Sequence, residues 1–213
     1  MKLFTLFLLQ LLCCFQVFAQ TGFNTLTDKG YQELADGKSA GAKQTLEQAL
    51  KVIPKDLALE PKADFFNNLG VAYYQTGDYK KGIDAYERSL DAYRKLKNDS
   101  LIAGALLNLG LAYKGIGAFK QATSAITQAA RLSERYGNQQ ELSAAWNAIG
   151  NIQRETGNYV KALEYHRRAL KIRKLIGYSK GTADSYHNIG IVYLDWKRYD
   201  KAEGYLLQAL EQK

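Results

Sequence analysis

The chain has 213 residues, 46% of them hydrophobic, with two prolines and a formal net charge of +8. Because proline interrupts helices and marks irregular loops, this composition predicts a mostly helical fold and disfavours a loop-rich one. The length suits one domain or a short repeat array, and the positive charge suits an acidic partner only if it is concentrated on one surface.

The first segment has the pattern of a secretory signal peptide. Lys2 gives a positive start, residues 3–18 form an apolar run, and the tripeptide that ends at Ala19 suits signal peptidase. We therefore expect residues 1–19 to be cleaved and the protein to be exported, to the periplasm or the medium. An uncleaved N-terminal anchor is the alternative, although the run is short for a spanning helix.

Both cysteines, Cys13 and Cys14, lie in this segment. A lipoprotein signal would need a small residue before the modified cysteine, and Leu12 stands there instead, which disfavours lipidation. Cleavage would leave no cysteine, so disulfides and thiol chemistry would be excluded from the mature chain.

From residue 23 onward the sequence repeats itself every forty residues. One glycine recurs at this spacing, at Gly30, Gly70, Gly110, Gly150 and Gly190. Most of these glycines have a large apolar residue four positions earlier, a small residue twelve positions later and a large residue sixteen positions later. A second set is expected to end the first helix of each repeat in a left-handed turn: Gly37, Gly77, Gly117 and Gly157. These columns predict pairs of helices packed closely at the first set of glycines.

The second repeat shows the full motif in Phe66, Leu69, Gly70, Tyr73, Gly82 and Tyr86. This pattern resembles the tetratricopeptide repeat. The resemblance implies an all-α fold, a right-handed superhelical solenoid of five helix–turn–helix repeats. The forty-residue spacing is similar to the long subtype found in kinesin light chain and in bacterial signalling sensors. The predicted repeats span 23–62 (degenerate), 63–102, 103–142, 143–182 and 183–213, the last without a capping helix.

The resemblance also implies a concave groove, lined by the first helices of successive repeats, in which ligands lie. Asparagines recur at this face, and an amide side chain can donate to and accept from a peptide backbone. Lys114 and Arg154 would add a positive centre for an acidic peptide. The predicted groove residues are Asn67, Asn68, Tyr74, Asn108, Lys114, Asn147, Asn151, Arg154, His187 and Asn188. The alternative is that they are solvated positions of amphipathic helices.

The positive charge is concentrated in the fourth repeat. Residues 143–182 contain eight Lys or Arg side chains and two glutamates, a net charge of +6. Charge alone would permit nucleic-acid binding. For an exported protein we expect instead a solvated face or attraction to an acidic surface, and no nucleic-acid partner.

Motifs for catalysis are absent from the sequence, which contains no phosphate-binding glycine loop, no metal-ligand spacing and no nucleophile with a base. We predict no enzymatic activity, cofactor or metal. His166 occupies a column otherwise filled by large residues, so we expect it to be packed between helices.

The sequence therefore predicts a non-enzymatic scaffold of the cell envelope that binds a protein or peptide. The alternative is the N-terminal periplasmic sensor portion of a histidine kinase or transcriptional regulator. Apolar side chains on the last helix have no predicted cover: Tyr205, Leu206, Leu207 and Leu210. Either the protein continues beyond them or the fifth repeat self-associates. Contact with a membrane is expected only if the signal is uncleaved or the chain continues.

Overall fold

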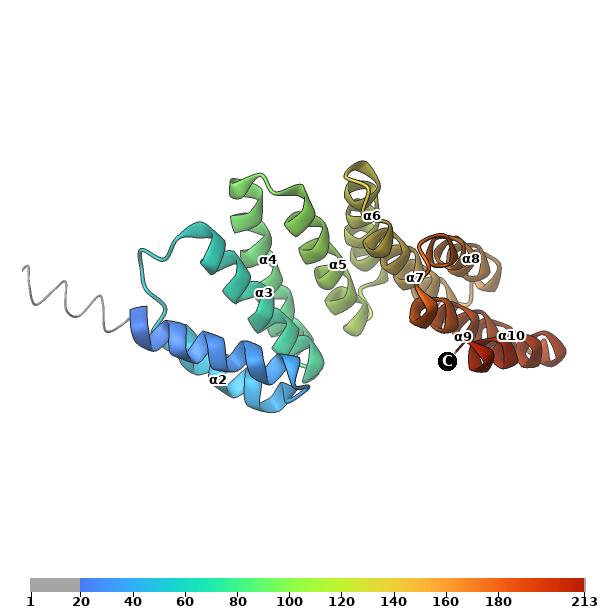
Figure 1. The fold of residues 1–213 in the computed structure, drawn as a ribbon, viewed down its shortest axis with the longest axis horizontal. Coiled ribbons are helices and arrows are strands. Elements are labelled where there is room, and N and C mark those ends of the chain that lie inside the picture. Colours follow the sequence, from blue (N-terminus) through green and yellow to red (C-terminus); the bar gives the residue numbers. More distant parts are fainter. Residues whose placement is uncertain (1–19, 213) are drawn as a thin grey trace, which may run out of the picture. The chain divides into compact units, whose positions relative to one another are not determined.

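The computed structural model describes residues 20–212, so the predicted signal peptide and both cysteines lie outside the described part of the chain. Every regular element within it is a helix, and successive helices pack as antiparallel pairs (Figure 1). The predicted all-α fold of paired helices is confirmed. The chain divides into two compact units, which meet at Lys97 and Asn98.

The first unit contains four helical segments. Residues 20–35 are helical, and they are followed by α2 (Ser39–Lys51), α3 (Leu59–Gln75) and α4 (Tyr79–Leu96). Phe23 lies 5.1 Å from Phe65, centroid to centroid, and Phe65 lies 5.2 Å from Phe66. These rings form one core with Leu46 and Leu69, all at most 2% exposed. The core joins the two helix pairs of the unit.

The second unit contains three helix pairs of almost uniform length. Its helices are α5 (Asp99–Gly115), α6 (Phe119–Arg135), α7 (Gln139–Glu155), α8 (Tyr159–Leu175), α9 (Ser179–Asp195) and α10 (Tyr199–Glu211). Ile126 and Ile149 are buried in one core, and Ile189 and Val192 in the next. Because each core takes side chains from consecutive pairs, each pair stabilises its neighbour.

The chain turns through a left-handed residue at nearly every connection. All four predicted turn glycines have positive φ, between 73° and 81°. The sequence analysis missed four further residues with positive φ: Lys97, Gly137, Gly177 and Lys197. The connections between repeats, at residues 97, 137 and 177, therefore end the preceding helix with a left-handed residue, as the connections within repeats do.

The recurring glycines are in close contact with the second helix of their own pair. A Cβ at Gly70 would lie 2.6 Å from the Tyr86 ring, and one at Gly190 would lie 2.8 Å from Leu206. The large residue sixteen positions later thus covers each glycine. The small residue twelve positions later contributes its backbone slightly further away, such as the carbonyl oxygen of Ala202 at 3.4 Å from a Cβ at Gly190.

Candidate functional site

The predicted groove residues of the second unit lie on its three first helices, α5, α7 and α9. Neighbouring members of this set are in contact, α5 with α7 and α7 with α9. At 100° per residue, Asn147, Asn151 and Arg154 share one face of α7. Along this face the predicted side chains are half-buried, except His187, which is exposed. We call this surface the first-helix face: Asn108, Lys114, Asn147, Asn151, Arg154, His187 and Asn188.

Two ion pairs connect the helices of this face. Lys114 Nζ lies 2.7 Å from Glu155 Oε1, which joins α5 to α7. Arg154 Nη1 lies 3.0 Å from Asp195 Oδ2, which joins α7 to α9 in the same way one repeat later. Each cation has a carboxylate partner, and the role of Lys114 and Arg154 as a positive centre for an acidic peptide stays a prediction.

Asn147 is the polar centre of the face. Its Oδ1 accepts a hydrogen bond from Asn188 Nδ2 at 2.8 Å and contacts His166 Nδ1 at 3.0 Å. Since this oxygen can only accept, His166 must donate from Nδ1, which leaves Nε2 without a proton. His166 is fully buried, and its Nε2 has no partner within residues 20–212. The prediction that His166 packs between helices is confirmed.

The imidazole of His166 stays neutral around pH 7. Burial lowers its pKa to about 4, with smaller contributions from the positive charges of Arg154 and Arg173. A neutral ring with a fixed Nδ1–H holds the Asn147 amide in one orientation. That orientation leaves Asn147 Nδ2 to donate and Asn188 Oδ1 to accept, because neither atom is used within the described residues.

Two further polar side chains of the face, those of Asn151 and His187, are available for hydrogen bonding to a ligand. Within the described chain, Asn151 and His187 form no side-chain hydrogen bond. Asn151 is one helical turn from Asn147 on α7, so its amide extends the row of donors and acceptors. Such a row of amides can hydrogen-bond to the alternating N–H and C=O groups of an extended peptide. These hydrogen bonds do not require a charged ligand.

The other three predicted residues, Asn67, Asn68 and Tyr74, lie on α3 in the first unit. Asn68 Nδ2 donates to the Asp64 carbonyl at 2.9 Å, and the ring of Tyr74 lies 5.6 Å from that of Tyr79. Asn68 is half-buried, and its role as a groove residue stays a prediction. The two sets of residues belong to separate units.

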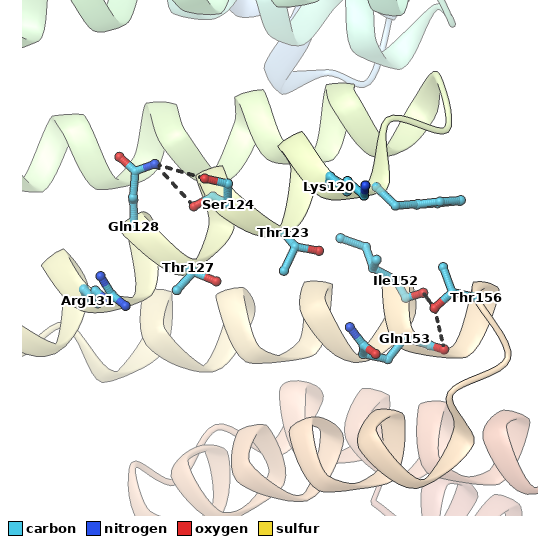
Figure 2. A pocket seen from close by; sticks show the side chains of 10 residues that line it. Lys120, Thr123, Ser124, Thr127, Gln128, Arg131, Ile152, Gln153 and Thr156 are labelled. Atoms are coloured by element: carbon cyan, nitrogen blue, oxygen red, sulfur yellow. Dashed lines mark hydrogen bonds between the residues drawn. The ribbon is translucent and has the colours of Figure 1, made fainter.

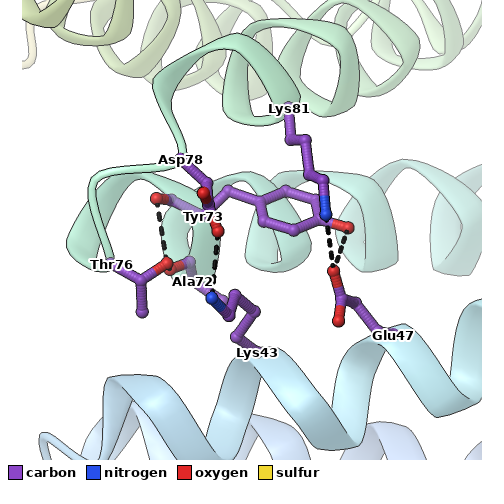
Figure 3. Close-up of polar contacts among 7 residues, drawn as sticks. All are labelled: Lys43, Glu47, Ala72, Tyr73, Thr76, Asp78 and Lys81. Carbon is purple, nitrogen blue, oxygen red and sulfur yellow. Dashed lines mark hydrogen bonds and ion pairs between the residues drawn. The ribbon is translucent and has the colours of Figure 1, made fainter.

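A polar network that the sequence analysis missed joins α2 to α3 and α4 (Figure 3). Lys43 Nζ lies 3.0 Å from Asp78 Oδ2. Glu47 Oε1 accepts from Lys81 Nζ and from the Tyr73 hydroxyl, both at 3.1 Å. These partners are 26 to 35 residues apart in sequence, so only the alignment of neighbouring repeats could have revealed them. The network therefore connects neighbouring repeats.

The last helix exposes part of its apolar surface. Leu207 and Leu210 are 53% and 62% exposed, whereas Tyr205 and Leu206 are half-buried. Self-association through this surface stays a prediction.

The described residues were compared with the requirements of a metal site and of a membrane span. Residues 20–212 contain no group of three or more His, Cys, Asp or Glu side chains that could hold a metal ion. Nor is any helix in that range both long and apolar enough to cross a membrane.

Comparison with known proteins identifies the fold. The family model described as tetratricopeptide repeat matches residues 62–135 and 141–213. The chain belongs to the tetratricopeptide repeat family. No curated protein matches the chain.

Solved structures of this tetratricopeptide repeat fold are similar at low sequence identity. BtubC (BKLC) from P. vanneervenii superposes with a TM-score of 0.71 and 17% identity, over 92% of this chain and 89% of its own. Putative kinesin light chain repeats from Podosopora anserina give a TM-score of 0.70 and 16% identity, over 89% and 93%. A Rap protein complexed with Competence and Sporulation Factor gives a TM-score of 0.78 and 16% identity, over 90% and 53%. The chain thus spans about half the length of that Rap protein, and these likenesses establish the fold alone.

Proposed function

We propose that this protein is a non-enzymatic scaffold that binds an extended segment of a partner protein on the first-helix face. The observation behind the proposal is the hydrogen-bonded pair Asn147 and Asn188, held by His166 beside the uncommitted amide of Asn151. Amide groups fixed in advance bind a peptide backbone with less loss of conformational entropy than mobile ones.

The family and its relatives support this proposal. Tetratricopeptide repeats stack into extended surfaces suited to long ligands. A Rap protein with this fold is complexed with Competence and Sporulation Factor, so a chain that contains such repeats can hold a ligand.

The ion pairs indicate which ligands suit the face. Because Lys114 and Arg154 are neutralised by Glu155 and Asp195, binding should depend mainly on hydrogen bonds to the backbone. We therefore expect the affinity for the peptide to depend only weakly on salt concentration, because salt screens attraction between charges and such attraction contributes little to this binding. This expectation separates the proposal from one based on an acidic ligand.

We further propose that the protein lies in the cell envelope and belongs to the long-repeat subtype of the family. The predicted signal peptide favours export, which would place the scaffold in the cell envelope. The starts of α3, α5, α7 and α9 at residues 59, 99, 139 and 179 support assignment to the long-repeat subtype.

Asn151 is the residue of choice for a test, because its replacement breaks no hydrogen bond within the described fold. Peptides selected from a random displayed library on the purified protein would be measured by fluorescence anisotropy against wild type and Asn151→Ala. We expect about two- to tenfold weaker binding by the variant, the effect of losing one hydrogen bond. The matched control is Gln140→Ala, an exposed position on the same helix, which should bind as wild type does. Selected peptides that bind Asn151→Ala and Asn188→Ala as tightly as wild type would exclude this face.

A further inference from the structure

A cavity of about 710 Å³ lies against α6 and the C-terminal part of α7 (Figure 2). It is a surface hollow that opens widely to solvent. The residues from α7 and its end are Ile152, Gln153 and Thr156. At 100° per residue, they lie on the side of α7 opposite to Asn147 and Asn151. The cavity is therefore separate from the first-helix face.

Uncharged polar side chains line the middle of the cavity. Thr123 and Thr127 form no side-chain hydrogen bond within the described chain, and Gln153 likewise has no side-chain partner there. Gln128 Nε2 makes only long contacts with Ser124, of 3.4 and 3.5 Å. The wall thus offers several donors and acceptors that the fold itself does not use.

The two ends of the wall are positively charged. Lys120 and Arg131 line the cavity, and neither has an ion-pair partner among residues 20–212. No carboxylate is among the lining residues, so the local charge favours an anionic ligand. Eleven residues separate the two cations along α6, about 16 Å at 1.5 Å per residue.

Comparison of the repeats shows that this combination of side chains is found only on α6 among the second helices of the described chain. The positions of Ser124, Thr127 and Gln128 are occupied in the other second helices by different sets of residues, most of them charged. They are Gln44, Glu47 and Gln48 on α2, Asp84, Glu87 and Arg88 on α4, Glu164, Arg167 and Arg168 on α8, and Gly204, Leu207 and Gln208 on α10. On α4 and α8 the arginine at the third of these positions lies over an aromatic ring, Phe66 at 4.0 Å and Trp146 at 5.6 Å.

We propose that this cavity binds an acidic segment of a partner protein in extended form. Carboxylates of the segment would pair with Lys120 and Arg131, and its backbone would hydrogen-bond to Thr123, Thr127 and Gln153. An extended chain advances about 3.3 Å per residue and its side chains alternate between two faces, so two carboxylates on the face toward the cavity would be about four residues apart. This site differs from the first-helix face in position, in charge and in the spacing it requires.

The probe is a fluorescein-labelled peptide of eight residues with glutamate at its second and sixth positions and glycine or serine elsewhere. Its binding to the full chain is measured by anisotropy at low salt. We expect Lys120→Glu and Arg131→Glu each to weaken binding roughly tenfold or more, the effect of losing a charge-assisted hydrogen bond. The matched control is Lys161→Glu, the same change at an exposed position on α8, with an expected effect below about twofold.

Two further comparisons test the geometry. A peptide with the same composition but adjacent glutamates should bind more weakly, and Thr127→Val, which keeps the side-chain shape but removes the hydroxyl, should weaken binding of the spaced peptide. Equal binding of the spaced and adjacent peptides, or unchanged binding by Lys120→Glu and Arg131→Glu, would overturn the proposal. So would loss of binding in Lys161→Glu alone, or capture of phosphatidylglycerol vesicles with no peptide binding. Asn151→Ala should bind the acidic peptide as wild type does, which separates this site from the proposed first-helix function.

Discussion

The imidazole of His166 on α8 lies directly over Gly150 on α7. A Cβ atom at position 150 would be 2.7 Å from His166 Cε1 and 2.8 Å from Nδ1. The ring that orients Asn147 is thus also the group that fills the space of a missing side chain. Packing between the two helices and the arrangement of the first-helix face depend on the same residue.

Gly150→Ala should therefore destabilise the protein although alanine is the better helix former. We expect a loss of about 1–3 kcal/mol in the free energy of unfolding, because the added methyl group forces His166 out of place. The measurement is urea denaturation followed by circular dichroism. Gly204→Ala on α10 is the control, since no atom lies within 4 Å of its Cβ position, and it should gain up to about 1 kcal/mol. Equal effects of the two substitutions would contradict the packing argument.

Stability should fall in acid because His166 is buried in its neutral form. Its pKa is about 4 in the folded chain, below the ordinary histidine value of 6.5. Between these values the unfolded chain binds more protons, so this contribution to stability is complete above about pH 6.5 and decreases as the pH falls toward 4. The full loss would be about 3 kcal/mol. Unfolding free energies between pH 7 and 4 would be compared for wild type, His166→Leu and His187→Gln. The loss of unfolding free energy between pH 7 and 4 should be smaller in His166→Leu and unchanged in His187→Gln. The same pH dependence in wild type and His166→Leu would show that His166 is not its cause.

The ion pair between Lys114 and Glu155 should contribute modestly to stability. Its side chains are 27% and 31% exposed, so solvent screens the pair only in part. A double-mutant cycle with alanine at both positions should give a coupling energy of about 0.5–1 kcal/mol, smaller at high salt. The ion pair of Arg88 with Asp84, at 3.9 Å and mostly exposed, is the comparison and should couple less.

Arg173 should not be replaceable by lysine. Its buried guanidinium donates to the Gly181 carbonyl and the Ser185 hydroxyl, both at 2.9 Å, and to the Ser143 hydroxyl at 3.3 Å. Lysine cannot reach three acceptors in this planar arrangement, so Arg173→Lys should cost about 1–3 kcal/mol in thermal or urea unfolding. Lys171→Arg, an exposed position on the same helix, should have little effect. If Arg173→Lys were as stable as wild type, the hydrogen bonds of the guanidinium would make no net contribution to the free energy of unfolding.

The fold could be predicted because its determinants recur within single repeats. Glycine at 30, 70, 110, 150 and 190 marks close helix contact, and Gly37 and its equivalents have the positive φ expected of them. The left-handed residues Lys97 and Lys197 were not predicted, since lysine adopts this conformation at a cost of about 1–2 kcal/mol. Only their places in the columns of turn glycines, forty residues from Gly137 and Gly157, indicate it.

The site was predicted only in part, because its contacts depend on the offset between neighbouring repeats. Asn147 and Asn188 are 41 residues apart, as are Lys114 and Glu155. A search for columns spaced by forty places such residues on the same face but does not pair them. The cavity beside Thr127 was missed for another reason: its short, uncharged side chains resemble an ordinary solvated surface.

The recurrence of one turn type has a consequence for how this protein can change in length. From residue 116 to residue 198 every connection is three residues long, with a left-handed residue in its middle. A duplication or deletion of forty residues with both ends at equivalent turns would rejoin the chain through a connection that it already uses. The number of helix pairs can therefore vary by unequal recombination without the invention of a new loop, and each added pair would lengthen the surface available to a ligand.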